Sequence, residues 1–180
     1  MKESKQIVVY GSYGYTGRLI VEKCKAQNLK LVLAGRNENA LKAQSVATGY
    51  PYHVVEIQDS EKLKNLLTPA ALVIHCGGPF LFTAKYMVQA CLETRTHYTD
   101  ITGEISVFEL LAKLDQDAKR AGIMLLPGAG FDVVPSDCLA LHLKNKLPDA
   151  SHLELAFAMS GGGSTRGTAK TAVLGLGEGS

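Results

Sequence analysis

The alternation of short apolar runs with amphipathic segments is the feature that most limits what this chain of 180 residues can fold into. The segments between the runs carry apolar residues at helical spacing, most clearly at Ala84, Met87, Val88, Cys91 and Leu92. Continuous apolar strands that alternate with amphipathic helices predict a parallel sheet covered on both faces. The runs predicted as strands are residues 6–10, 30–34, 52–57, 71–75, 96–99 and 123–126.

Six such units predict an α/β fold, a Rossmann-like doubly wound parallel sheet of about six strands with helices on both faces. One helix is expected to start at a capping box, Ser106-x-x-Glu109, and to end at Gly122. The pattern changes after Pro148, and residues 153–159 form a strand-like run with no helix after it. We therefore predict a first domain at residues 1–148 and the start of a truncated second domain at 149–180.

Composition excludes several classes of protein. The chain is 46% apolar and 20% charged, as globular domains are, and its net charge of +2 argues against nucleic-acid binding. The apolar runs are too short to cross a bilayer, and the polar first six residues do not resemble a secretory signal. The cysteines lie far apart without a CxxC pair, which predicts buried thiols, a reducing cytoplasmic location and no metal site.

The strongest local motif directly follows the first apolar run. Glycines at this spacing let the backbone turn sharply and approach a pyrophosphate, while the N–H groups of the next helix face the anion. A strand before the motif and a helix after it are the context that a dinucleotide-binding loop requires, although a glycine-rich turn without a ligand is the alternative. The residues predicted to contact a dinucleotide are Gly11-Ser12-Tyr13-Gly14-Tyr15-Thr16-Gly17.

An arginine, Arg36, ends the second run at the position where an NAD site places a carboxylate for the ribose hydroxyls. A guanidinium cannot accept a hydrogen bond, but it can pair with a 2′-phosphate and stack on adenine. The cofactor is therefore predicted to be NADP, with NAD less favoured. Arg36 could instead be a solvated side chain, and Glu38 leaves a ribose acceptor open. Glu56 and Ile57 are predicted to lie at the adenine edge.

The fourth run delivers Cys76-Gly77-Gly78-Pro79-Phe80, predicted to lie beside the nicotinamide because ligands bind at the carboxyl ends of the strands. His75 could donate a proton, although a lone histidine on an apolar strand is more often a hydrogen-bonded core residue. The candidates for substrate binding follow the fifth and sixth runs, and the first three of them could equally cap a helix. They are Asp100, Thr102, Glu104 and Asp132.

Other catalytic motifs are missing. None of the seven tyrosines has a lysine four residues later, so the Tyr-x-x-x-Lys pair of short-chain dehydrogenases is absent. His97 and Asp100 could ligate a metal, but no third ligand has recognisable spacing. We therefore assign no catalytic residue and expect no metal.

Several stretches together resemble the saccharopine dehydrogenase-like oxidoreductases, and more closely their bacterial and trans-acting enoyl reductase branch. The resemblance implies an N-terminal NAD(P)-binding Rossmann domain and a C-terminal domain that closes the substrate cleft. By position, Gly11, Gly14 and Gly17 match the phosphate loop, Arg36 the 2′-phosphate site, and residues 77–80 the nicotinamide-side loop. The stretches are residues 9–19, 34–36, 76–80, 90–91, 96–104, 127–137 and 160–168.

The function predicted from these features is NADP-dependent hydride transfer between nicotinamide and a small carbonyl, imine or enoyl substrate. The chain itself is expected to be the cofactor-binding fragment and to be inactive alone. The alternative is a non-catalytic NADP-binding sensor or scaffold. The expected partner is a small-molecule substrate, and nucleic acid is not expected as one. The sequence leaves open whether the chain forms a homo-oligomer. No membrane-spanning segment is expected.

Overall fold

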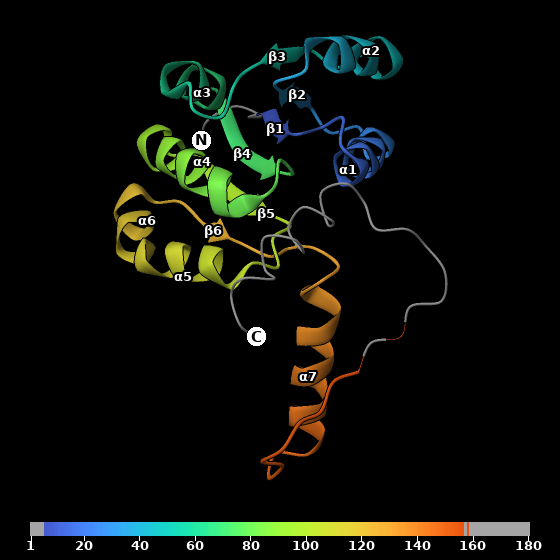
Figure 1. The fold of residues 1–180 in the computed structure, drawn as a ribbon, viewed down its shortest axis with the longest axis vertical. Helices are drawn as coiled ribbons and strands as arrows, with labels where there is room; N and C mark the ends of the chain where they lie inside the picture. The colour runs from blue at the N-terminus through green and yellow to red at the C-terminus, as the bar shows by residue number, and fades with distance from the viewer. Residues whose placement is uncertain (1–5, 157, 159–180) are drawn as a thin grey trace.

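A six-stranded parallel sheet in the order β3-β2-β1-β4-β5-β6 forms the centre of the computed structural model, which describes residues 6–156 and 158 (Figure 1). β1 is the central strand, and Val8 pairs with Val32 of β2 on one side and Val73 of β4 on the other. The order confirms the predicted doubly wound fold. The strands are β1 Gln6–Tyr10, β2 Leu31–Gly35, β3 Tyr52–Val54, β4 Ala70–His75, β5 His97–Asp100 and β6 Leu125–Leu126.

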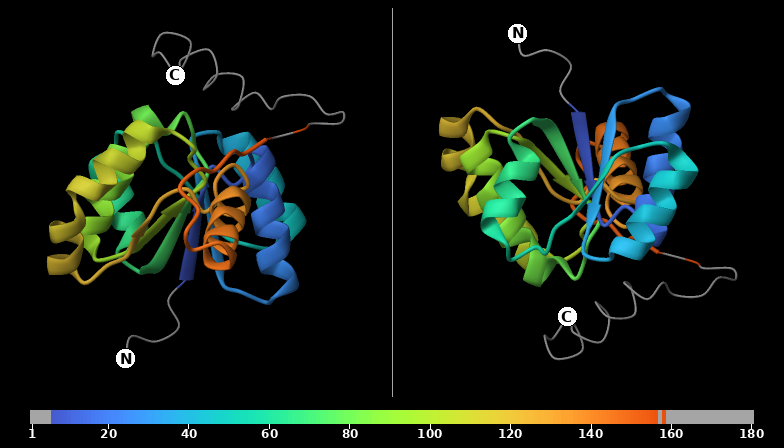
Figure 2. Two further views of the ribbon diagram at one scale, coloured as in Figure 1. Left: turned by 90° about the horizontal axis from the view of Figure 1, so that it is seen from below. Right: turned by 90° about the horizontal axis from the view of Figure 1, so that it is seen from above.

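Helices cover both faces of this sheet (Figure 2). One face carries α1 (Tyr15–Ala26) and α2 (Glu38–Thr48). The opposite face carries α3 (Ser60–Leu67), α4 (Phe80–Thr94), α5 (Ile105–Lys113) and α6 (Asp115–Ala121). The strand order reverses between β1 and β4, so α1, which follows β1, and α4, which follows β4, lie on opposite faces of the sheet. The site described below lies at this point of reversal.

Alternate residues of the strands fill two separate cores. Val8 and Tyr10 of β1 belong to the larger core with residues of α3, α4 and α5, such as Leu63 and Met87. Val9, between them, belongs to the smaller core with residues of α1 and α2. Because successive side chains of a strand point to opposite faces, strands buried on both faces read as continuous apolar runs.

The helix predicted from Ser106 to Gly122 is two helices, α5 and α6, which meet at Leu114. The predicted capping box is wrong, because Glu104 is the N-cap of α5 and its side chain caps another helix. Apolar spacing continues across Leu114, so the period alone does not show the break. Gly122 ends α6 with φ +69°, as a C-terminal glycine does.

The last described helix, α7 (Val134–Lys146), projects from the carboxyl edge of the sheet and has no buried residue (Figure 1). Its Cys138 is exposed and Cys76 is half-buried, whereas Cys24 and Cys91 are buried. The prediction of buried thiols is therefore confirmed for Cys24 and Cys91 and wrong for Cys138. Of the strand predicted at 153–159, residues 153–156 are not in a strand, and 157 and 159 lie outside the described residues. Most of 149–180 also lies outside them, and the boundary at 148 stays a prediction.

Candidate functional site

The loops after β1 and β4 start side by side at the carboxyl edge of the sheet. The backbone N–H of Cys76, which follows β4, donates to the carbonyl of Tyr10 at 2.8 Å. From there the chain turns to α1 on one face and to α4 on the other. Such a switch point is where open α/β sheets bind ligands. The structure thus brings together residues 11–17 and 76–80, which the sequence predicts at the cofactor.

Two of the three loop glycines occupy positions where no side chain fits. Gly11 has φ +79°, and a Cβ there would lie 2.9 Å from the carbonyl carbon of Cys76. A Cβ at Gly17 would lie 2.8 Å from the carbonyl oxygen of Ser12. The N–H of Gly14 closes the turn by donating to the Gly11 carbonyl at 3.0 Å. The loop therefore requires these glycines.

Among the described residues, no side chain accepts a hydrogen bond from the first turn of α1, in contrast to the first turns of α2, α3 and α4. Gly14 is its N-cap, and the first turn contains no acidic residue. Side-chain oxygens of Asn37, Asp59 and Glu104 accept hydrogen bonds from the first turns of α2, α3 and α4. Free first-turn N–H groups and the positive end of the helix dipole favour an anion. The loop and helix of this chain thus fit a diphosphate.

Ser12 holds the loop against α2 through its side chain. Its hydroxyl donates to Gln44 Oε1 at 2.7 Å, and Gln44 Nε2 donates back to the Ser12 carbonyl at 2.9 Å. Ser12 is completely buried, whereas Tyr15 is exposed. Gln44 is a positioning residue that sequence reasoning missed, because it lies 32 residues from its partner.

Tyr13 connects the glycine loop to the end of β2. Its hydroxyl accepts the backbone N–H groups of Arg36 at 3.3 Å and Asn37 at 3.2 Å. A Cβ at Gly35 would lie 2.6 Å from the Tyr13 ring. The exposed Arg36 is thus held next to the loop, and Arg18 Nε donates to the Tyr13 carbonyl at 2.8 Å. Arg18 is a second guanidinium at this turn, which its place directly after Gly17 could have indicated.

Tyr10 lies between the glycine loop and the segment after β3. Its hydroxyl donates to the Val55 carbonyl at 3.0 Å, and burial together with the Glu56 charge raises its pKa above the usual range. Glu56 is exposed, whereas Ile57 is only 6% exposed and packs in the larger core. Of the two residues predicted at the adenine edge, Glu56 is therefore accessible to a ligand and Ile57 is not.

The carboxylate of Asp100, at the end of β5, is completely buried and bound from three sides. It accepts hydrogen bonds from the Tyr98 hydroxyl at 2.5 Å, the Thr102 N–H at 3.0 Å and the Gly128 N–H at 2.8 Å. Thr102 Oγ1 in turn accepts from the Glu104 N–H at 3.0 Å. None of the three side chains caps α5, the helix expected from Ser106, so the capping alternative is wrong for that helix. Asp100 and Thr102 bind the backbone of neighbouring loops, and the Glu104 carboxylate caps α4 instead. A substrate role for these residues stays a prediction.

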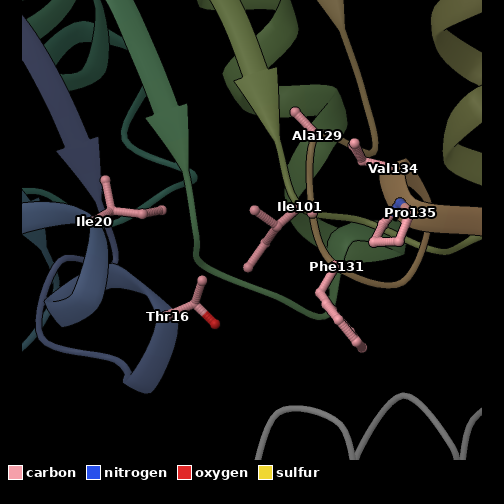
Figure 3. Close-up of a pocket in the computed structure, with 8 residues that line it drawn as sticks. Thr16, Ile20, Ile101, Ala129, Phe131, Val134 and Pro135 are labelled. Carbon is pink, nitrogen blue, oxygen red and sulfur yellow. The ribbon is translucent and has the colours of Figure 1, made fainter. Parts of the chain in front are cut away.

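An open pocket of about 390 Å³ lies between the start of α1 and the loops after β5 and β6 (Figure 3). Thr16 and Ile20 of α1 line one side, and Ile101 and Phe131 lie across from them (Figure 3). Ala129, Gly130, Val134 and Pro135 complete the lining. None of these described lining residues is charged. The exposed Asp132 directly follows Phe131.

Two features are absent from residues 6–156 and 158. In this part of the chain, no helix combines the length and apolar character needed to cross a bilayer. The same residues contain no group of three or more histidine, cysteine or acidic side chains that could hold a metal.

Comparison with known proteins decides the family. Residues 7–126 match the family described as the saccharopine dehydrogenase NADP binding domain. The chain belongs to this family. The resemblance stated from the sequence is confirmed, and NADP is the cofactor, as Arg36 predicts.

Individual relatives agree with this assignment. A saccharopine dehydrogenase-like oxidoreductase of Mus musculus is 28% identical over 96% of this chain and 46% of that protein. A trans-acting enoyl reductase of Mycobacterium ulcerans is 28% identical over 84% of this chain and 38% of that protein. The fold resembles apo saccharopine dehydrogenase (L-Glu forming) of Saccharomyces cerevisiae, with TM-score 0.71 and 19% identity over 80% of this chain and 31% of that one. The chain thus spans less than half the length of these relatives.

Proposed function

We propose that this chain is the cofactor-binding part of an NADP-dependent oxidoreductase that transfers hydride between nicotinamide and a small carbonyl, imine or enoyl substrate. The open first turn of α1 behind the glycine loop is the observation that carries the proposal. Its N–H groups have no side-chain acceptor among the described residues, and they lie beside a turn in which Gly11 and Gly17 leave no room for side chains. This combination suits a diphosphate that comes close to the backbone.

Residues around this loop supply the rest of the proposed cofactor site. Arg36, whose backbone N–H donates to the Tyr13 hydroxyl, would pair with the 2′-phosphate that distinguishes NADP from NAD. Arg18, which donates to the Tyr13 carbonyl, is a second cation at this loop. Glu56 would reach the adenine edge, because it is exposed and Ile57 is buried. Residues 76–80 would lie along the nicotinamide half on the other side of the switch point.

The pocket beside α1 is the proposed place of the reaction. NADP supplies hydride chemistry when it is bound, and the chain's task is to orient the ring and exclude water. Ile20, Ile101 and Phe131 give the pocket apolar walls, and Thr16 gives it one hydroxyl. Of the predicted substrate-binding residues, we propose a contact for Asp132 and positioning roles for Asp100, Thr102 and Glu104, because Asp132 alone is exposed.

The test is an assay of NADPH oxidation with carbonyl, imine and enoyl substrates. It compares this chain with a longer protein that also carries the C-terminal domain that the resemblance implies. Turnover by the longer protein alone supports the proposal. Binding without turnover in both supports a sensor or scaffold and contradicts the oxidoreductase. Cytoplasmic location stays a prediction, to be tested by fractionation. The oligomeric state, which the sequence leaves open, is measured by sedimentation.

A further inference from the structure

His75, the last residue of β4, is a completely buried polar side chain among aromatic rings. The ring centroids of Tyr10, Phe80 and Tyr98 lie 5.5, 5.2 and 6.2 Å from its own. Burial lowers the pKa of His75 from 6.5 to about 3, so its imidazole is neutral at ordinary pH. A neutral buried imidazole is a poor proton donor, and this agrees with the core role rather than the catalytic one.

The hydrogen bonds of His75 determine which ring nitrogen carries the proton. The Gly77 N–H donates to Nδ1 at 3.4 Å, so Nδ1 is unprotonated. Nε2 lies 3.0 Å from Thr83 Oγ1, and that hydroxyl donates its single hydrogen to the Pro79 carbonyl at 3.1 Å. Thr83 must therefore accept from Nε2–H. The imidazole is the neutral Nε2–H tautomer, and all three hydrogen bonds are satisfied at once.

These bonds hold the loop between β4 and α4 at both ends. Nδ1 holds Gly77, and Nε2 holds the Pro79 carbonyl through Thr83. The loop also rests directly on the rings: a Cβ at Gly77 would lie 3.0 Å from the Tyr10 ring and 3.2 Å from His75 Cε1. An apolar side chain could fill the volume of the imidazole, but it could not make the polar connections. His75 therefore does more for this loop than pack.

We propose that His75 is a positioning residue that fixes residues 77–80 in the conformation that receives the nicotinamide half of NADP. This inference rests on the proposed function, because it takes that loop as part of the cofactor site. The adenosine half lies on the other side of the switch point, toward β2 and β3, and does not depend on this loop. Loss of the His75 bonds should therefore weaken one half of the cofactor site and spare the other.

The experiment compares two ligands of this chain by calorimetry: NADPH and adenosine 2′,5′-bisphosphate, which lacks the nicotinamide. His75→Phe removes both polar connections, and we expect the NADPH Kd to rise about tenfold. The Kd of the bisphosphate should change less than about twofold. Thr83→Val removes only the hydroxyl that links His75 Nε2 to the Pro79 carbonyl, so it should raise the NADPH Kd by less than His75→Phe does. Thr83→Ser keeps this hydroxyl and should have the wild-type Kd.

Thr96→Val is the matched control. Thr96 is a completely buried threonine that donates to the Leu67 carbonyl at 2.9 Å and contacts Thr94 Oγ1 at 2.9 Å. It precedes β5, at the amino edge of the sheet, away from the site. The variant should lower the free energy of unfolding without changing the ratio of the two Kd values. That separates loss of a buried threonine hydrogen bond from loss of loop position.

Each result decides the inference. Selective weakening of NADPH, with an unprotonated Nδ1 in the ¹⁵N spectrum of the wild-type imidazole, supports it. Equal weakening of both ligands, no weakening, or a protonated Nδ1 overturns it. If His75→Phe does not fold, His75→Asn and Thr83→Val make the same comparison. A wild-type chain that binds neither ligand refutes the proposed function itself, whereas normal wild-type binding with unaffected variants refutes the role of His75 alone.

Discussion

The Glu104 carboxylate, which follows β5, lies 2.6 Å from the backbone nitrogen of Leu81 in the first turn of α4. It also accepts the Phe80 N–H at 3.0 Å. The amino end of α4 is thereby closed to an external anion, whereas no described side chain accepts a hydrogen bond from the first turn of α1, at the same edge of the sheet. Of these two helices at the switch point, only α1 thus leaves its first turn open to a diphosphate.

Removal of the Glu104 carboxylate should destabilise the fold. Glu104→Ala leaves the N–H groups of Phe80 and Leu81 without their acceptor, and we expect a loss of about 1–3 kcal/mol in the free energy of unfolding. Glu104→Gln keeps one acceptor oxygen and should lose less. Denaturant titration measures both, with the exposed Glu109→Ala of α5 as the control. A loss no greater than that of Glu109→Ala would show that the cap is unimportant.

The glycine loop should not tolerate a methyl group at Gly17. Gly17→Ala puts a Cβ against the backbone of Ser12, which must shift, and we expect NADPH affinity to fall more than about tenfold. Gly103→Ala is the control, since a Cβ there would have an ordinary contact of 3.7 Å. Fluorescence titration of NADPH measures the affinity of each variant. Unchanged affinity in Gly17→Ala would mean that the loop does not hold the diphosphate.

Arg36 should account for the preference for NADPH over NADH. A charge-assisted hydrogen bond contributes about 1.5–3 kcal/mol, so Arg36→Ala should remove roughly a tenfold to hundredfold preference. Arg120→Ala, an exposed arginine of α6 that pairs with Asp117, is the control and should leave the preference intact. Titration of both cofactors against the three proteins gives the comparison. Equal wild-type affinities for NADPH and NADH would refute the role of the arginine.

The neutral His75 should make the fold sensitive to acid. The unfolded chain protonates this histidine near pH 6.5, but the folded chain does so only near pH 3. Between these values the unfolded state binds more protons, so the His75 contribution is complete above pH 6.5 and is lost as the pH falls. The slope is at most about 1.4 kcal/mol per pH unit.

His75→Asn isolates this contribution, because the other titrating groups are common to both proteins. The difference in unfolding free energy between wild type and variant should shrink as the pH falls from 7 to 4. Urea titrations at several pH values provide the measurement. A difference that stays constant over this interval would show that His75 titrates alike in the folded and unfolded chains.

The strands were predictable because burial on both faces leaves continuous apolar runs. The prediction for β4 ends at His75, as the strand does, but the third run was predicted to reach Ile57, whereas β3 ends at Val54. Val55 and Ile57 are buried, so they fill the core from a connecting segment. Apolar character reports burial, and it does not separate a strand from a buried loop.

In the candidate site too, local features could be predicted from the sequence, whereas contacts between distant residues could not. The requirement for Gly11 and Gly17 is local, since the turn itself excludes side chains, and the sequence predicts both. The contact of Tyr13 with Arg36 and that of Glu104 with Leu81 join residues 23 apart in sequence. Such partners depend on which loops the sheet brings to one edge. Local spacing therefore could not show that Glu104 caps α4 rather than the helix that follows it.

Binding of NADP to this chain is tested most directly by calorimetric titration of the folded 180-residue chain with NADPH and NADH, after circular dichroism has established that it is folded. We expect saturable heat with one NADPH per chain and weaker binding of NADH. A folded chain that gives no heat with either nucleotide would contradict this expectation.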